Sequence, residues 1–209
     1  MEFPDMKAIF DYKNVEAYLA KQLPKASWSA AVLNFALYLI VVGIATFISL
    51  LIGPAGSTGI GAVGMLVMAI AIMIVGFVSF FIGGGILHLI AKAFGGTGRL
   101  VQLLYLISVV SLAIAPISFV LVLLDSIPYV SCISSICVLA LSIYSLYLSY
   151  LILMIAYKLD STKAIMTLVA DLVVIVIIMV IVFVLFFGAL AALYGLGSMT
   201  SGVPGPGSP

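Results

Sequence analysis

Five long runs of apolar residues dominate this sequence and constrain its fold more than any other feature. A helix needs about 20 apolar residues to cross a hydrocarbon core of about 30 Å, because each residue rises about 1.5 Å. Every backbone amide must also be satisfied within such a segment, since lipid offers no hydrogen-bond partners. The runs of sufficient length are residues 28–52, 62–91, 100–124, 129–157 and 164–194. The sequence therefore predicts an all-α, polytopic integral membrane protein with five transmembrane helices.

The composition excludes a soluble globular protein. Hydrophobic residues make up 66% of the chain and charged residues only 7%, whereas soluble domains are about 25% charged. The formal net charge is +1, and the Lys and Arg residues are scattered along the chain. Nucleic-acid binding requires a concentrated basic patch, so we expect the lipid bilayer, and no nucleic acid, as a partner. The first run is too long for a cleavable signal and is predicted to remain as a span.

Polar and glycine-rich segments separate the runs and predict the turns. They are GPAGSTGIG (53–61), KAFGGTGR (92–99), DSIP (125–128) and KLDSTK (158–163). In the last of them, Asp160 or Ser161 is expected to cap the following helix. We therefore predict three regions: an N-terminal segment (1–27), a five-span domain (28–194) and a Gly/Pro/Ser-rich tail (195–209) that is expected to be disordered.

All eight Lys and Arg residues fall on one side of the predicted bundle. They are Lys7, Lys13, Lys21 and Lys25 before the first run, Lys92 and Arg99 between the second and third, and Lys158 and Lys163 between the fourth and fifth. Cytoplasmic loops are enriched in Lys and Arg, so the N-terminus is predicted to be cytoplasmic and the C-terminus extracytoplasmic. In the first cytoplasmic hairpin, Gly95 and Gly96 are expected to turn the chain, while Lys92 and Arg99 lie at the headgroups.

The segment before the first run predicts a short helix, capped by Asp5 and ended before Pro24. Its apolar face contains Ala8, Tyr12, Val15, Leu19 and Leu23. Two interpretations remain open for this face. The helix lies on the inner leaflet, or it packs on the cytoplasmic ends of the membrane helices.

Serine residues form a stripe along the fourth predicted span. They fall within an arc of about 100° on a helical wheel and comprise Ser131, Ser134, Ser135, Ser142, Ser145 and Ser149. The third span carries Ser108, Ser111 and Ser118 on one side. Because small hydroxyl residues let helices approach closely and bond across a contact, the favoured interpretation is a packing seam. The alternative is one wall of a polar path for water or neutral solutes.

Asp171 is the most costly residue in the predicted membrane domain. An aspartate at a helix centre costs about 2.5–3.5 kcal/mol on insertion scales, so it is expected to face protein. Its predicted partner is His88, which also lies in the cytoplasmic half of its span. Such a pair would form a proton-coupled or ligand site, or a structural polar clamp. If the last helix begins late, Asp171 instead lies near the interface.

No pattern in the sequence supports catalysis, a cofactor or a metal. His88 is the only histidine, and neither GxSxG nor HExxH is present. Cys132 and Cys137 would point about 140° apart on a helix, so no disulfide is expected between them. The run GGTGR (95–99) lacks the preceding strand and the GK[ST] ending of a phosphate-binding loop, which favours an ordinary loop. We therefore predict a protein that is not an enzyme.

Three segments of the chain resemble the YIP (Yip-one) domain family. They are residues 84–99, with the glycine-rich end of the second span and a lysine before Gly95 and Gly96; residues 105–116, with a proline in the third span; and KLDSTKAIM (158–166). The resemblance covers residues 28–187. It implies a five-span membrane protein with a cytoplasmic N-terminus.

The resemblance also implies a role in membrane organisation. Eukaryotic members of the family bind Rab-type GTPases, associate with one another and act in vesicle traffic. This chain lacks a long acidic or proline-rich cytoplasmic region and a DLYGP-like motif, and it is more similar to prokaryotic members, which implies the cell membrane as its location. We predict a non-catalytic, self-associating membrane scaffold or interaction protein, with a small GTPase as a partner by resemblance only. The alternative is a small-molecule or proton-linked transporter that uses Asp171, His88 and the serine stripe.

Overall fold

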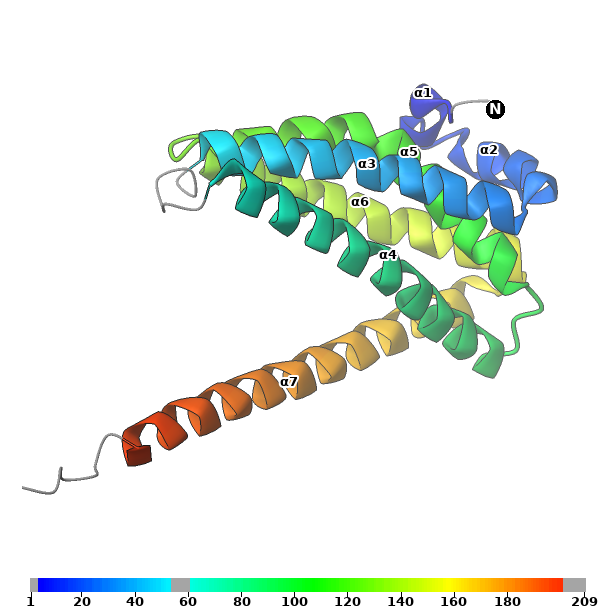
Figure 1. Ribbon diagram of the computed structural model, residues 1–209. Helices are drawn as coiled ribbons and strands as arrows, with labels where there is room; N and C mark the ends of the chain where they lie inside the picture. Colours follow the sequence, from blue (N-terminus) through cyan, green and yellow to red (C-terminus); the bar gives the residue numbers. More distant parts are fainter. Residues whose placement is uncertain (1–3, 54–60, 201–209) are drawn as a thin grey trace, which may run out of the picture. The chain divides into compact units, whose positions relative to one another are not determined.

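The computed structural model describes residues 4–53 and 61–200, with side chains over 4–53, 61–185 and at 187. Every element over these residues is a helix (Figure 1). In chain order they are α1 (Met6–Phe10), α2 (Val15–Gln22), the 3₁₀ turn η1 (Leu23–Lys25), α3 (Trp28–Ile52), α4 (Ala62–Ala93), α5 (Leu100–Asp125), α6 (Ser131–Tyr157) and α7 (Ser161–Thr200). Helices α3 to α7 are long and apolar enough to cross a membrane, which confirms the predicted fold class.

The ends of the spans follow the predicted turn residues closely. Helix α3 has the predicted bounds, whereas α6 begins two residues later than expected, at Ser131. The reason is a tight turn in which the amides of Val130 and Ser131 both donate to the carbonyl of Ile127 at 3.0 Å. Helix α7 begins at Ser161, where the amide of Ala164 donates to the carbonyl of Asp160 at 2.9 Å.

The C-terminal end of α7 differs from the prediction. The helix continues through Thr200, so the expected disorder from residue 195 is wrong for residues 195–200. Gly195 and Gly197 weaken a helix but do not block it, whereas the next proline in the chain is Pro204. Residues 201–209 of the predicted tail lie outside the described residues.

The N-terminal segment is helical and its last α-helix, α2, ends before Pro24, as predicted, but the segment forms two short helices in place of one. The Asp5 cap is confirmed, because its carboxylate accepts from the amides of Lys7 at 3.0 Å and Ala8 at 3.4 Å. The break follows from Asp11, whose side chain accepts from the amide of Lys13 at 3.1 Å and from Asn14 Nδ2 at 2.7 Å. Such local side-chain bonds compete with helical hydrogen bonds and stabilise a turn.

The apolar side chains of α1 and α2 pack against the membrane helices. Ile9, Val15 and Leu19 are fully buried and belong to the same core as residues of α5 and α6. The ring of Phe10 stacks on Tyr144 of α6 with centroids 5.3 Å apart, and the Tyr144 hydroxyl donates to the carbonyl of Ile9. The structure therefore favours the second interpretation, in which these helices pack on the ends of the membrane helices.

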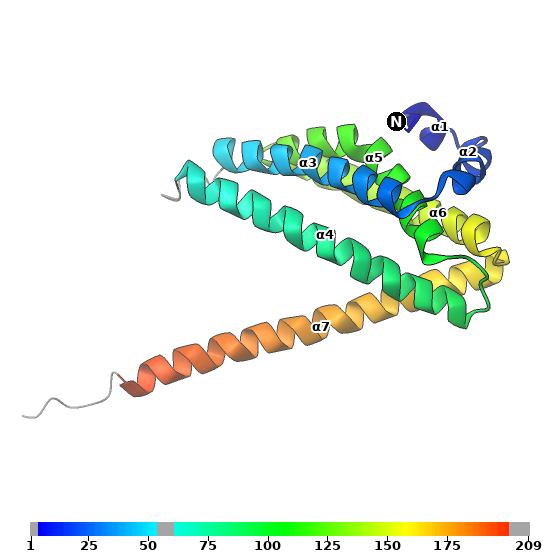
Figure 2. The same ribbon diagram turned by 45° about the vertical axis from the view of Figure 1, so that its right-hand side comes forward.

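The chain divides into two compact units, Met1–Leu168 and Val169–Pro209. In the first unit, α5 is the central helix and contacts α3, α4 and α6 (Figures 1 and 2). Its fully buried side chains include Leu103, Leu104 and Leu106. Because lipid is as apolar as leucine, this close packing, rather than a hydrophobic driving force, stabilises the contacts. The second unit, over its described residues, is the remaining length of α7.

Candidate functional site

A glycine-rich loop joins α4 to α5 at the predicted cytoplasmic end of the first unit. Gly95 has a φ of +88°, a conformation that favours glycine. The amides of Gly95 and Gly96 donate to the carbonyls of Lys92 at 3.0 Å and Ala91 at 2.9 Å. These bonds fold the loop back over the end of α4. Gly95 and Gly96 thus turn the chain, as predicted from the sequence.

This loop packs directly on the end of α6. The carbonyl of Tyr157 accepts from the amide of Thr97 at 3.1 Å. A Cβ added at Gly98 would lie 2.4 Å from the carbonyl oxygen of Ala156, and one added at Gly96 would lie 2.8 Å from Tyr157 Cδ1. Real Cβ atoms do not approach so closely, so only glycine fits at these two positions. We call this contact between residues 96–98 and residues 156–157 the Tyr157 junction.

His88 completes the Tyr157 junction from α4. Its Nδ1 shares a hydrogen bond with the Tyr157 hydroxyl, and the two rings lie 5.6 Å apart between centroids. Tyr157 itself is only 1% exposed. Tyr157 could not be identified from the sequence, because a tyrosine at the end of an apolar run carries no signal of its tertiary partners.

The predicted partner of His88 was Asp171. Asp171 belongs to the second unit, is half-buried, and one of its carboxylate oxygens is shielded without a hydrogen-bond partner among the described residues. The pairing of His88 with Asp171 stays a prediction, and the hydrogen bond that the structure gives His88 is the one to Tyr157.

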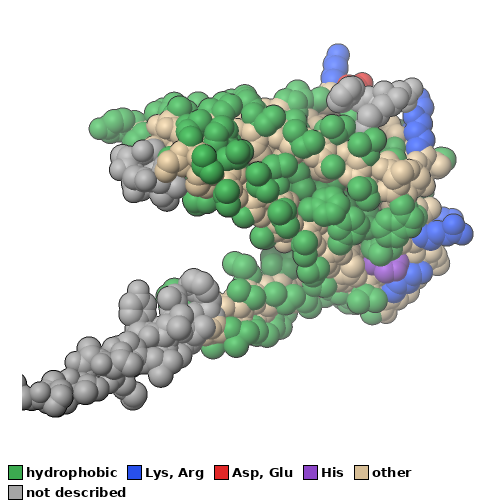
Figure 3. Space-filling model, in the orientation of Figure 1, with side chains coloured by type: hydrophobic (Ala, Val, Ile, Leu, Met, Phe, Trp, Pro, Cys, Tyr) green, Lys and Arg blue, Asp and Glu red, His purple; other side chains and the backbone are tan. Residues whose placement is uncertain are grey.

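Two cationic residues directly follow the segments of the Tyr157 junction, Arg99 after Gly98 and Lys158 after Tyr157. Lys92, Arg99, Lys158 and Lys163 are all exposed, as is the neighbouring Asp160. Figure 3 shows Lys and Arg side chains gathered at this end of the first unit, with the histidine beside them. Lys158 adopts a left-handed φ of 52°, which ends α6 and turns the chain toward α7.

The backbone of the glycine-rich loop does not form a phosphate nest. The amides of Gly95, Gly96 and Thr97 donate to carbonyls of the protein, and the amide of Arg99 donates to Gln102 Oε1 at 3.0 Å. Because these four donors are occupied, they are not free to bind an anion.

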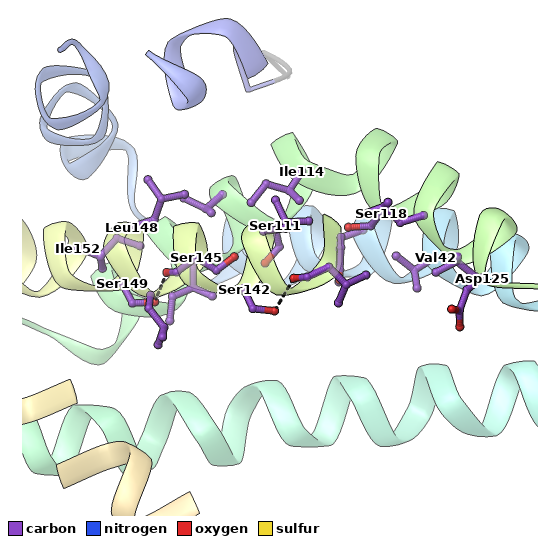
Figure 4. Close-up of a pocket in the computed structure, with 18 of the residues that line it drawn as sticks. Val42, Ser111, Ile114, Ser118, Asp125, Ser142, Ser145, Leu148, Ser149 and Ile152 are labelled. Atoms are coloured by element: carbon purple, nitrogen blue, oxygen red, sulfur yellow. Dashed lines mark hydrogen bonds between the residues drawn. The ribbon is translucent and has the colours of Figure 1, made fainter. Parts of the chain in front are cut away.

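Serines of α5 and α6 line one cavity in the first unit (Figure 4). Its volume is about 830 Å³ and α3 contributes Tyr38 and Val42 to its wall. The lining serines are Ser111 and Ser118 of α5 and Ser135, Ser142, Ser145 and Ser149 of α6. The structure thus brings together six of the nine predicted serines. Ser108, Ser131 and Ser134 are not among the lining residues.

Most of the cavity wall is apolar, and three of its serine hydroxyls, those of Ser135, Ser142 and Ser149, are bonded locally. Ser142 donates to the carbonyl of Val138 at 2.8 Å and Ser149 to that of Ser145 at 2.9 Å. Asp125, which the sequence analysis placed only in a turn, also lines the cavity and accepts from Ser134 Oγ at 2.9 Å. The cavity therefore offers a mostly apolar space with several locally bonded hydroxyl groups and a carboxylate.

Among the described residues, no three His, Cys, Asp or Glu side chains are placed to hold a metal ion. Cys132 and Cys137 are free and exposed on α6.

Replacing Tyr157 with phenylalanine is expected to lower the free energy of unfolding by about 0.5–1.5 kcal/mol, because it removes one hydrogen bond while keeping the ring. The measurement is a denaturant titration in mixed micelles. Tyr129→Phe is the matched control, since Tyr129 is 95% exposed. Equal stability of the two variants would show that the His88 bond to Tyr157 contributes nothing.

The Yip1 domain model matches residues 18–185. No curated protein and no solved structure matches the chain. The match covers most of the 209 residues, including the glycine-rich loop and KLDSTK, on which the resemblance was based. The five apolar helices agree with an integral membrane protein. The chain therefore belongs to the Yip1 domain family.

Proposed function

We propose that this protein is a non-catalytic membrane scaffold that self-associates in the bilayer through the serine-bearing face of α6. The observation that carries the proposal is the local bonding of the hydroxyls of Ser135, Ser142 and Ser149, each of which donates to a carbonyl of α6 at 2.8–2.9 Å. A serine satisfied in this way can face an apolar helix without an unpaired polar group. Small side chains on this face also allow a partner helix to approach closely.

The predicted topology is part of this proposal. In this topology, the N-terminus of the protein and the loops that meet at the Tyr157 junction lie in the cytoplasm. The loop after Asp125 lies on the opposite side of the membrane. The support is the placement of all Lys and Arg residues before α3, within residues 92–99 and within residues 158–163.

Ser142→Leu tests the proposed interface. The larger side chain is expected to keep partner helices apart and to weaken self-association by about tenfold or more. The measurement is single-molecule photobleaching of the full chain in bilayers at increasing dilution. Ala140→Leu is the matched control, because Ala140 is also exposed on α6 but does not line the cavity. An equal effect of both variants, or none, would contradict the proposal.

A second candidate function is transport of a small solute, and the cavity favours it. A space of about 830 Å³ with serines and Asp125 in its wall has the size of a small-molecule site. In this case Ser145→Leu is expected to reduce the uptake of small neutral solutes, such as glycerol or urea, into liposomes. Asp171→Asn is expected to abolish any part of that uptake that a proton gradient drives. A scaffold would show neither uptake nor these losses.

A further inference from the structure

The excess positive charge of the predicted cytoplasmic side lies in two loops. Before α3, the four lysines are balanced by four acidic residues, Glu2, Asp5, Asp11 and Glu16. The two loops with their adjoining helix turns, residues 92–99 and 158–163, contain the other four cations, and their only acidic residue is Asp160. The two remaining carboxylates, Asp125 and Asp171, lie outside these loops. An anion on this side is therefore attracted to the two loops more than to the N-terminal segment.

The Tyr157 junction joins the two loops into one surface. Thr97 donates to the carbonyl of Tyr157 at 3.1 Å, and Gly98 lies against Ala156. Arg99 directly follows Gly98, and Lys158 directly follows Tyr157. The two cationic residues thus extend from segments in backbone contact, and both side chains are exposed.

We propose that this surface binds the phosphate of an anionic lipid headgroup, with Arg99 and Lys158 as its principal side chains. The Arg99 guanidinium offers a planar fork of donors that matches phosphate oxygens, and Lys158 adds a compact charge. Lys92 and Lys163 raise the local positive potential from the last turn of α4 and the first turn of α7. The backbone amides of Gly95, Gly96, Thr97 and Arg99 already have acceptors, so these four amides do not compete with the side chains for the phosphate.

The position of the surface favours a lipid over a soluble anion. Lys92 and Arg99 lie at the ends of α4 and α5, and Lys158 directly follows α6. The ends of spanning helices lie at the depth of the headgroups, where anionic lipids concentrate on the cytoplasmic leaflet. A headgroup phosphate therefore reaches these side chains while its acyl chains stay beside the apolar helices.

The test is native mass spectrometry of the full chain in detergent, titrated with phosphatidylglycerol or phosphatidylcholine. We expect preferential retention of phosphatidylglycerol, and about a tenfold or greater loss of its apparent affinity in the double variant Arg99→Gln/Lys158→Gln. The matched control is Lys7→Gln/Lys13→Gln, which removes the same charge from the balanced N-terminal segment. It is expected to retain the lipid as the unsubstituted protein does.

Additional measurements test whether Arg99 and Lys158 bind one phosphate together or act as independent charges. Each single variant, Arg99→Gln or Lys158→Gln, is expected to show more than half of the loss in binding free energy that the double variant shows. The losses are not additive because both side chains bind the same phosphate. Purely additive losses, an equal loss in the Lys7/Lys13 control, or no preference for phosphatidylglycerol would overturn the proposal. Displacement of the lipid by inorganic phosphate at comparable concentration would also overturn it, because the anion would then be a free phosphate. Unchanged thermal unfolding of each variant verifies that the fold is intact.

Discussion

Replacing Tyr157 with alanine is expected to lower the free energy of unfolding by about 3–5 kcal/mol, the range for removing a buried aromatic side chain. Tyr157 is 1% exposed, and its ring contacts the glycine-rich loop and His88. The substitution leaves a cavity where α4, α6 and the loop meet, and it leaves His88 without its hydrogen bond. Denaturant titration in mixed micelles measures the change.

The control for this substitution is Tyr129→Ala. Tyr129 is 95% exposed, so its truncation is expected to change stability by no more than about 0.5 kcal/mol. Of the two variants at position 157, Tyr157→Phe is expected to be less destabilised than Tyr157→Ala. If Tyr157→Ala were no less stable than Tyr129→Ala, the Tyr157 junction would not hold the helix ends together.

Gly98→Ala is expected to destabilise the protein by about 1–3 kcal/mol, because the added methyl group overfills the junction. The new Cβ would lie 2.4 Å from the carbonyl oxygen of Ala156 and 2.8 Å from Tyr157 Cγ. The nearest atom belongs to the backbone of a helix end, so it cannot move aside as a side-chain tip would. The same titration in mixed micelles measures the loss.

Gly83→Ala provides a comparison of opposite sign. A Cβ at Gly83 meets no atom within 4 Å, and Gly83 lies inside α4. Alanine there is expected to stabilise the protein by about 0.4–1 kcal/mol, since it restricts the unfolded chain. Stabilisation by both substitutions would mean that Gly98 does not contact α6.

The spans were predictable because length and turn chemistry dominate in lipid. An apolar run must be helical to satisfy its own backbone, and glycine or charged segments such as KAFGGTGR mark where the helix ends. The structure differs from the prediction mainly in where two helices break or end. The side chain of Asp11 formed a turn that divided the N-terminal helix, and Gly195 did not end α7.

The candidate site was only partly predictable, for a physical reason. Periodicity placed the serines on one face of α6, and the structure brings four of them to one cavity with Ser111 and Ser118 of α5. Periodicity cannot give the distance between helices, so it could not distinguish a packing seam from a cavity wall. It likewise gave no signal that Gly98 and Tyr157, far apart in sequence, lie in contact.

The most direct test of the account asks whether the two loops of the Tyr157 junction lie on the cytoplasmic side. Single cysteines would replace Thr97, Thr162 or Ile127 in a Cys132→Ala/Cys137→Ala background, and all three positions are exposed. With a membrane-impermeant thiol reagent, we expect Thr97→Cys and Thr162→Cys to be labelled only from the cytoplasmic side and Ile127→Cys only from the opposite side. Labelling of Thr97→Cys and Thr162→Cys from different sides would contradict the junction and the topology together.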